Sequence, residues 1–490
     1  MTTRVRTTHG TETDLDRTRV EDLRAWLRGP LLQAGEAGYD AARAIWNGMI
    51  DRHPALIVRA SGAADVRTTV RFAREHDLLL GIKGGGHNIA GTAVPDGGLM
   101  LDLSALKGIH VDLESRTVRV QPGCVWGDVD HETQPQGLAV PNGVISTTGV
   151  SGLTLGGGFG WTTRRFGYTS DNLIAADVIT ADGERLRASA DENPDLFWGI
   201  RGGGGNFGVV TLFAFQAHSV GPEVVGGMIL HPMKRAREVI DFFRDFTAHA
   251  PDELTCLLVL RKAPPAPALP KELHGRPVAI IAACYVGPVA EGERVLQPLK
   301  AFGQPLADLI GPKPFAAIQT MLDAGSPHGR EYYWKSDYFR GLPDEAVVPM
   351  IEHAEAITSP QSAVLFMHLG GAANRLPADH SAAGPRDIDY VLNIQGAWLE
   401  PAESETHTRW VRDYWRAVHP HSSGQAYMNF FTADEGADRL RAAYADATYQ
   451  RLAALKARFD PDNFFRLNQN IQPAAAGRAP ALVRASLVPK

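Results

Sequence analysis

Clusters of glycine constrain this chain more than any other feature of its sequence. Of its 490 residues, 50 are glycine, and many of them lie in three clusters at 84–86, 156–160 and 202–208. Because glycine has no side chain, such a cluster can adopt unusual backbone angles, and a ligand can approach its backbone closely. The clusters therefore predict loops that lie against a bound ligand.

The first cluster lies between a predicted strand and a histidine. The sequence GIKGGGHNIAG at 81–91 places three glycines directly before His87. Their N–H groups could face the phosphates of a ligand while His87 is held beside it. A loop histidine that is merely hydrogen-bonded is the commoner case. This spacing alone leaves both interpretations open.

The other two clusters lie in different sequence contexts. The glycines of GVSGLTLGGGFGWTTRRFG at 149–167 are too close together for a regular element, which predicts a loop along a flat or extended ligand, with a purely structural loop as the alternative. The pattern Gly203-x-Gly205-x-x-Gly208 matches the dinucleotide fingerprint, but β-branched and aromatic residues come after it instead of a helix. A Rossmann fold that binds a nicotinamide cofactor is therefore rejected.

Several other classes of function lose support. The sequence has no GxxxxGK[ST], HExxH, GxSxG or EF-hand pattern, and its three cysteines are too few and too far apart for a disulfide framework or a CxxC metal site. We therefore expect no metal. The net charge of −6 is not gathered into a long block of one sign, so no nucleic-acid partner is expected. No segment resembles a signal peptide or a membrane span, and we expect a cytoplasmic protein with no membrane partner.

The order of predicted elements indicates an α+β fold. A strand, a helix and a strand are predicted across 55–83, with hairpins within 99–121 and 173–189 and a strand at 207–218 after them. After about residue 223 the glycines become sparse, and amphipathic segments alternate with strand-like runs. This change predicts a second domain, a sheet backed by helices.

Taken together, these motifs resemble those of a known family. The segments Gly84-Gly85-Gly86-His87-Asn88, 149–160 and 195–208, with Tyr427-Met428-Asn429 and 466–471 near the C-terminus, resemble the berberine bridge enzyme-like oxidases. These belong to the vanillyl-alcohol oxidase, or PCMH-type, FAD superfamily. The resemblance covers about residues 45–473 and is weakest between 223 and 390. It implies an N-terminal helical segment (1–45), a two-part PCMH-type FAD-binding domain (46–222), a substrate domain with an antiparallel sheet backed by helices (223–425) and a C-terminal segment that completes the FAD domain (426–490).

The resemblance also implies how FAD is held. In the family, the histidine after the glycines is bonded to the 8α-methyl group of the flavin, and His87 stands at that position. Many relatives have a second bond from a cysteine, but Ile145 stands there in this chain and cannot form a thioether. We therefore expect FAD to be attached at His87 only, as in the bacterial 6-hydroxynicotine oxidase-like branch. The other residues expected to contact the cofactor are Lys83, Gly84, Gly85, Gly86, Asn88, Thr148, Gly149, Gly152, Gly156, Gly157, Gly158, Gly160, Asn206, Gly208, Asn468 and Asn470.

Candidates for the catalytic residues come from the same resemblance. Asn393 and Gln395 are two apart on a predicted strand and so point to one face, and Tyr427 and Asn429 belong to the C-terminal motif. Neither Asn393 nor Gln395 is a titratable base. The proton acceptor is then Tyr427 or, as a rival, Lys335, because a desolvated lysine can be neutral. The alternative for Lys335 is a surface cation beside its neighbouring aspartate.

The implied reaction is a flavin oxidation. We expect hydride transfer from an alcohol, an amine or a secondary metabolite to flavin N5. The small residue Thr148 favours reoxidation by O2 with formation of H2O2. A dehydrogenase or cyclase with another acceptor, and a flavin-carrying binding protein without turnover, stay as alternatives. A homodimer is a candidate oligomeric state.

Overall fold

The strand, helix and strand predicted across 55–83 form the first of three main sheets. The structure is a computed structural model and describes residues 2–265 and 269–475. In this sheet the strand order is β3-β4-β6-β5, with β4 and β5 parallel to β6. Its elements are β3 (Leu31–Leu32), β4 (Leu56–Arg59), α3 (Ala63–Glu75), β5 (Leu80–Lys83) and β6 (Leu99–Asp102).

The N-terminal segment is only partly helical. Besides α1 (Arg17–Trp26) and α2 (Tyr39–Arg43), it contains a hairpin of β1 (Thr3–Arg6) and β2 (Glu12–Leu15). Val5 and Leu15 are buried in the same hydrophobic core as α3. The expectation of a helical segment misses this hairpin because its strands are only four residues long, too short to show a clear period.

A second, antiparallel sheet carries both predicted hairpins, with the strand order β11-β10-β12-β8-β7. The strand after the third glycine cluster is its central strand, so the absence of a helix at that point is confirmed. Helices α4 and α7 pack into its core through apolar side chains. The elements are β7 (Ile109–Asp112), β8 (Thr117–Val120), α4 (Trp126–Thr133), β10 (Leu173–Ile179), β11 (Arg185–Ser189), α7 (Pro194–Ile200) and β12 (Val209–Gln216).

The prediction of a pure loop at 149–167 is wrong. Two short helices form there, α5 (Val150–Leu155) and α6 (Thr163–Phe166). Glycines flank α5 on both sides, whereas its interior has the buried side chains of Val150 and Thr154. The glycine spacing therefore marks the ends of a helix as well as loop positions.

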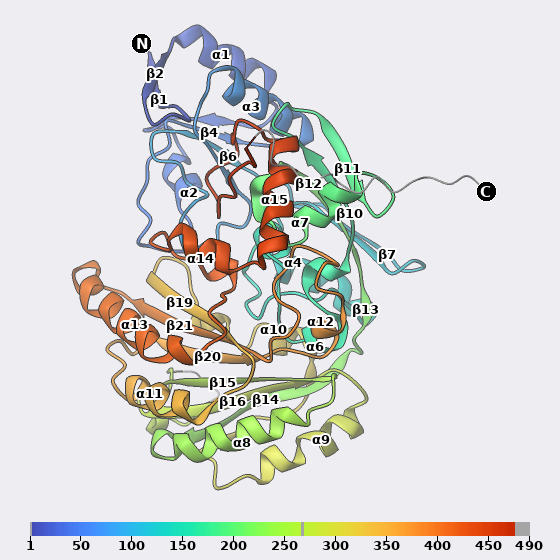
Figure 1. Cartoon of the computed structure of the whole chain (residues 1–490), viewed down its shortest axis with the longest axis vertical. Helices are drawn as coiled ribbons and strands as arrows, with labels where there is room; N and C mark the ends of the chain where they lie inside the picture. Colours follow the sequence, from blue (N-terminus) through green and yellow to red (C-terminus); the bar gives the residue numbers. More distant parts are fainter. Residues whose placement is uncertain (1, 266–268, 476–490) are drawn as a thin grey trace.

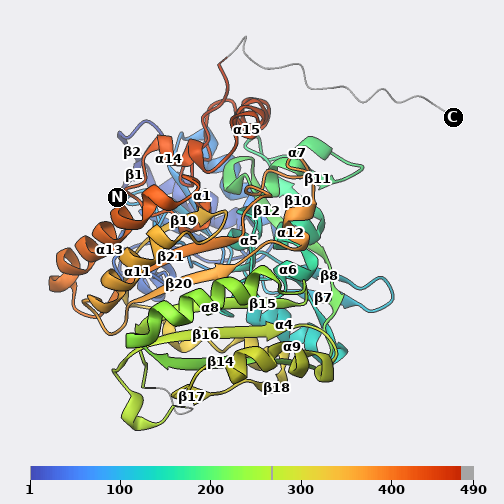
Figure 2. The same cartoon turned by 60° about the horizontal axis from the view of Figure 1, so that its bottom comes forward.

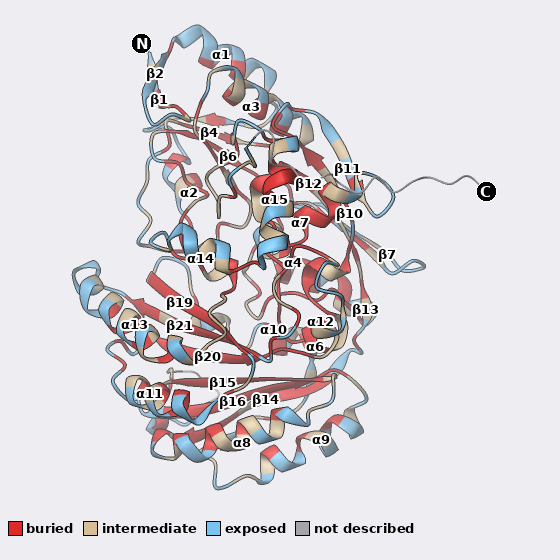
Figure 3. Ribbon diagram, in the orientation of Figure 1, coloured by how far each residue is buried: buried red, intermediate tan, exposed pale blue. Residues whose placement is uncertain are grey.

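The third and largest sheet is antiparallel throughout and has helices on one face (Figures 1 and 2). Its side chains alternate between two cores, since Leu258 packs with the helices and Leu257 packs on the opposite face. Outer faces of the helices are exposed (Figure 3). In sheet order the strands are β17 (Ala307–Asp308), β14 (Glu223–Pro232), β16 (Pro277–Tyr285), β15 (Leu254–Lys262), β20 (Ala363–His368), β21 (Tyr390–Trp398) and β19 (Glu331–Phe339), with β18 (Gly311–Pro314) also on β14, and the helices are α8 (Ala236–Ala248), α9 (Val289–Ala301), α11 (Asp344–Glu355) and α13 (Ser404–Val418).

The C-terminal segment returns to the first part of the chain (Figure 1). The predicted helix α15 (Asp446–Phe459) ends before Asp460-Pro461, after a short helix α14 (Ala437–Ala442). Lys456 and Asp460 form a fully buried ion pair of 2.7 Å, and Lys456 Nζ donates to the carbonyl of Asn206 at 2.8 Å. The last helix is thereby fixed beside the third glycine cluster.

Candidate active site

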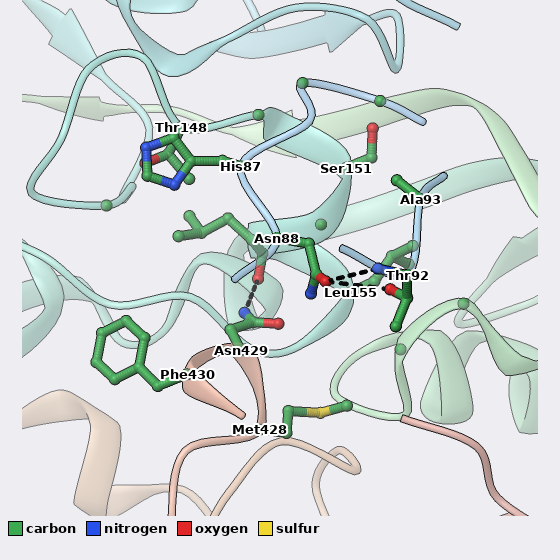
Figure 4. Close-up of a pocket in the computed structure, with 18 of the residues that line it drawn as sticks. His87, Asn88, Thr92, Ala93, Thr148, Ser151, Leu155, Met428, Asn429 and Phe430 are labelled. Atoms are coloured by element: carbon green, nitrogen blue, oxygen red, sulfur yellow. Dashed lines mark hydrogen bonds between the residues drawn. The ribbon is translucent and has the colours of Figure 1, made fainter. Parts of the chain in front are cut away.

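A cavity of about 260 Å³ lies where the glycine segments meet the large sheet. The predicted residues that line it come from segments far apart in the sequence, and Figure 4 shows several of them. From the expected cofactor set they are Gly84, Gly85, Gly86, His87, Asn88, Thr148, Gly149, Gly152, Gly208 and Asn468, and from the expected catalytic set Asn393, Gln395, Tyr427 and Asn429.

The first two glycine segments touch through their backbones. A methyl group placed on Gly85 would lie 2.4 Å from Cα of Gly149, and one placed on Gly84 would lie 2.7 Å from Oγ of Ser151. Gly86 has a φ of +68°, a region that favours glycine. These positions need glycine to bring both backbones to the cavity wall.

His87 stands between a tryptophan and the cavity. Its ring stacks on Trp46 with centroids 4.3 Å apart, and Trp46 stacks in turn on Tyr332 at 3.7 Å. Burial, and to a lesser degree the nearby His328, lower the pKa of His87 to about 3. Its Nε2 has no hydrogen-bond partner among the described residues. The imidazole is therefore neutral at neutral pH and has an unpaired nitrogen.

Tyr427 and Asn429 form a hydrogen-bonded pair at the cavity. Asn429 Nδ2 donates to Tyr427 Oη at 2.7 Å and to the carbonyl of Leu153 at 3.2 Å, the second of which appears in Figure 4. The N–H of Gly158 also donates to Tyr427 Oη, at 3.1 Å. Burial raises the pKa of Tyr427, although both hydrogen bonds oppose that rise. Tyr427 is therefore a neutral phenol whose oxygen accepts two hydrogen bonds.

Asn393 and Gln395 lie on the cavity face of β21, together with Val391. The strand alternates as expected, since Leu392 and Ile394 belong to the core under the helices. Asn393 is only 3% exposed, and neither atom of its amide has a hydrogen-bond partner among the described residues. Donor and acceptor thus lie side by side at this wall.

The structure contradicts Lys335 as a neutral base. Its Nζ donates to Glu435 Oε1 at 2.7 Å and to Asp434 Oδ1 at 3.3 Å. Burial lowers its pKa, but the two carboxylates outweigh burial and the net pKa is raised. On β19 the neighbour Trp334 lines the cavity, so Lys335 points to the opposite face. It is a buried, paired cation, not a surface one.

Several residues expected to contact the cofactor do not line the cavity. Lys83 donates to the carbonyls of Ala42 and Ala44 at 2.6 and 3.2 Å and so fixes the N-terminal segment. Asn206 is occupied with the C-terminal segment, because its Oδ1 accepts from the N–H of Ile471 at 3.0 Å. Asn470 lies outside the wall, although its neighbours Leu467, Asn468 and Gln469 line it.

The glycines at 156–160 pack against protein instead. A methyl group on Gly156 would lie 2.1 Å from Oδ1 of Asn429, one on Gly158 would lie 2.4 Å from Oγ1 of Thr169, and one on Gly160 would lie 2.0 Å from the carbonyl oxygen of Asn142. Gly157 has a φ of +104°. Gly156, Gly157, Gly158 and Gly160 therefore shape the turn that carries Phe159 to the cavity wall, and none of these four glycines lines the cavity.

Sequence reasoning missed the apolar part of the wall. It is formed by side chains of β15, β19 and β20 and by two phenylalanines: Leu257, Trp334, Leu365, Met367, Phe159 and Phe430. The strand period could have indicated Val391 beside Asn393, but the pairing of β21 with β19 and β20 joins segments distant in sequence.

Metal clusters and membrane-spanning helices are both absent from the part of the chain that the structure describes. No group of three or more His, Cys, Asp or Glu side chains in the described ranges is arranged to hold a metal ion. No helix in the same ranges is both long enough and apolar enough to cross a membrane.

Comparison with known proteins agrees with this arrangement. Residues 54–189 match the family model described as FAD binding domain, and residues 426–472 match the one described as Berberine and berberine like. An FAD-linked oxidoreductase of Dictyostelium discoideum is 31% identical over 432 residues, which cover 87% of this chain and 91% of that protein.

Two further similarities concern one type of bacterial enzyme. The (R)-6-hydroxynicotine oxidase of Paenarthrobacter nicotinovorans is 28% identical over 467 residues, 91% of this chain and 97% of the relative. The crystal structure of 6-hydroxy-D-nicotine oxidase from Arthrobacter nicotinovorans superposes with a TM-score of 0.81 at 26% identity, covering 91% of this chain and 98% of that one.

These findings confirm the α+β, PCMH-type fold and the expected class of enzyme. The match of the glycine segments to an FAD model fits the wall that they form, and the match at the C-terminus includes the Tyr427–Asn429 pair. This chain belongs to the berberine bridge enzyme-like FAD-linked oxidoreductases.

Proposed function

We propose that this enzyme holds FAD through one covalent bond to His87 and oxidises a small alcohol, amine or secondary metabolite, with O2 as the final acceptor. The observation that carries the proposal is the neutral, unpaired imidazole of His87 at the wall of a glycine-lined cavity. Bound FAD would supply the hydride acceptor.

His87 is suited to a covalent attachment. Burial depresses its pKa to about 3, so a nitrogen lone pair is free at neutral pH. The stack on Trp46 fixes the ring plane. Ile145 lines the same cavity and offers no sulfur, which supports one bond and no second tether.

Backbone groups would hold the rest of the cofactor. The described residues that line the cavity include no Lys and no Arg, so the FAD phosphates would be met by N–H groups of the glycine segments. The contact of Gly85 with Gly149 brings two such segments together. Asn468 and Gln469 would close the wall from the C-terminal side.

Tyr427 is our candidate for the proton acceptor. It would act as the phenolate: burial opposes that form, whereas the hydrogen bonds from Gly158 and Asn429 would stabilise it. Asn393 and Gln395 would orient the substrate as neutral donors and acceptors. Lys335 is not a candidate, because two carboxylates hold it on the other face of β19.

The identity of the electron acceptor depends on one position. Thr148 lies on the cavity wall, and a small side chain there supports access of O2. The names of the nicotine-derivative oxidases among the relatives support an oxidase acting on an amine. A dehydrogenase or cyclase with another acceptor is the second candidate. A cytoplasmic location and a homodimer stay predictions from the sequence.

One experiment tests the proposal. The purified yellow protein is mixed under nitrogen with a panel of alcohols and amines, and loss of flavin absorbance is followed. We expect at least one compound to bleach the flavin and air to restore the colour with release of H2O2. No bleaching by any compound would favour a flavin-carrying protein without turnover, and slow recovery in air would favour another acceptor.

A further inference from the structure

The cavity wall has no fixed charge. Among the described residues that line it there is no Asp, Glu, Lys or Arg. Its titratable side chains are His87 and Tyr427, and burial keeps both neutral at neutral pH. The FAD phosphates would meet the N–H groups of the glycine segments, but a charged group on the side formed by β15, β19, β20 and β21 would lose its hydration without gaining a counter-charge. This side of the cavity therefore disfavours carboxylates and ammonium groups alike, so an amine substrate would bind as its uncharged form.

One polar spot on the sheet side of the cavity has no hydrogen-bond partner among the described residues. On β19, Ser336 lies directly opposite Asn393 of β21, and Leu365 of β20 lies on the other side of Asn393. Ser336 Oγ and both atoms of the Asn393 amide are buried, and none has a partner among the described residues. The side chain of Leu365 has no polar atom with which they could form a hydrogen bond. Buried polar atoms are nearly always hydrogen-bonded. Since the described residues offer these atoms no partner, we expect a bound ligand to supply it.

Aromatic rings surround the same space. Phe430 meets Trp334 edge to face with centroids 5.3 Å apart, and it meets Phe159 in the same way at 5.8 Å. All three rings line the cavity. Ring faces and edges of this kind favour flat apolar bodies.

We propose that the site takes an uncharged, flat molecule with a hydrogen-bond donor and an acceptor side by side, and that Asn393 determines this specificity. Amides, lactams and hydroxylated nitrogen heterocycles have this chemistry. The inference rests on the proposed function, since it names the substrate class of the same cavity. Asn393 acts by forming hydrogen bonds to the ligand with both atoms of its amide. Ser336, directly opposite on β19, adds a hydroxyl group beside that amide.

Four probes of nearly one shape separate charge from hydrogen bonding. Benzamide is neutral with a donor and an acceptor, acetophenone is neutral with an acceptor only, benzoate is an anion, and benzamidinium is a cation. Binding to the purified holoenzyme at pH 8 is measured by equilibrium dialysis and by ligand-observed NMR, neither of which needs turnover. We expect benzamide to bind about tenfold more tightly than each of the other three.

Two variants locate the effect at Asn393. Asn393→Leu keeps the branched shape of the side chain and should weaken benzamide about tenfold and acetophenone less, because acetophenone can make only one of the two hydrogen bonds. Asn393→Asp should reverse the order, so that benzamidinium binds more tightly than benzamide. Gln304→Glu adds the same charge on an exposed turn after α9 and should leave all four affinities unchanged. A reversal of preference cannot come from a loss of stability alone.

Each contrary result overturns a defined part of the proposal on substrate specificity. Benzoate or benzamidinium binding as tightly as benzamide would overturn the preference for neutral ligands, and so would a failure of benzamide to bind. An unchanged benzamide affinity in Asn393→Leu would overturn the role of Asn393. Failure of the proposed function is seen separately, as purified protein without flavin or as flavin that no substrate reduces.

Discussion

Gly85 and Gly149 meet backbone to backbone. A methyl group on Gly149 would lie 2.7 Å from Cα of Gly85, and one on Gly85 would lie 2.4 Å from Cα of Gly149. Real Cβ atoms do not approach other atoms so closely, so neither position accepts alanine without a shift of backbone. This contact joins the segment that carries His87 to the segment that carries Thr148, and both line one cavity.

Gly149→Ala should therefore yield protein with much less bound flavin. The added methyl group must separate the two segments, which also costs on the order of 1–3 kcal/mol of stability. The ratio of flavin to protein absorbance measures the effect. Gly311→Ala is the matched control, because a methyl group there meets no atom within 4 Å. Full flavin content in Gly149→Ala would mean that the close approach is not needed.

Tyr427→Phe should slow reduction of the flavin about 100-fold, the usual contribution of a positioned acid or base. The variant removes only the hydroxyl group that accepts from Gly158 and Asn429. Stopped-flow bleaching under nitrogen measures the rate. Tyr338→Phe changes another buried tyrosine, one that does not line the cavity, and should reduce normally. An unchanged rate in Tyr427→Phe would exclude this phenol as the proton acceptor.

Lys335→Met should separate stability from catalysis. The change removes the partner at 2.7 Å from the Glu435 carboxylate, which keeps only Arg439 at 3.5 Å, so we expect a loss on the order of 1–3 kcal/mol in the free energy of unfolding. The rate of flavin reduction per bound flavin should stay as in the wild type. A reduction rate that falls with intact stability would restore this lysine as the base.

Asp130 should make stability depend on pH. It is buried on α4, its carboxyl group accepts from Asn142 Nδ2 at 3.0 Å, and burial raises its pKa to about 8. Because the folded-state pKa lies above the unfolded value near 4, the unfolded chain binds fewer protons between these values. Stability from this group is complete below about pH 4 and is lost as the pH rises towards 8.

Asp130→Asn should remove that loss. Between pH 5 and pH 8, we expect the wild type to lose on the order of 3–4 kcal/mol more than the variant. Chemical denaturation at the two pH values measures the difference, and Glu132→Gln, an exposed position on the same helix, is the control. Equal pH slopes in wild type and Asp130→Asn would show that this carboxyl group is ionised in the folded protein.

Local patterns predicted much of the fold. The elements around β4 to β6 and both hairpins agree with short-range periodicity, and α15 ends where Asp460-Pro461 stops a helix. The hairpin of β1 and β2 was not predicted, because its stability comes from the burial of Val5 and Leu15 beside α3. Burial against a distant element leaves no periodic trace in four residues.

The sequence predicted the parts of the site where glycine motifs expose the backbone. It did not predict the positions of side chains that depend on contacts with distant parts of the chain. His87 and Gly149 line the cavity as expected, whereas Lys83 and Lys335 turn away from it because carbonyls and carboxylates elsewhere pair with them. The glycines at 156–160 pack on Asn429 and on other protein atoms, not on the cavity. A sequence shows which residues have no side chain, but not which neighbour needs the space.

The covalent bond to His87 is tested most directly by the mass of the unfolded protein. The holoenzyme is denatured in acid and its intact mass is measured beside that of His87→Ala. We expect the wild type to have the mass of the chain plus one FAD and the variant to have the mass of the chain alone. Bare polypeptide from the wild type, or the same added mass in His87→Ala, would contradict a flavin bond at this histidine.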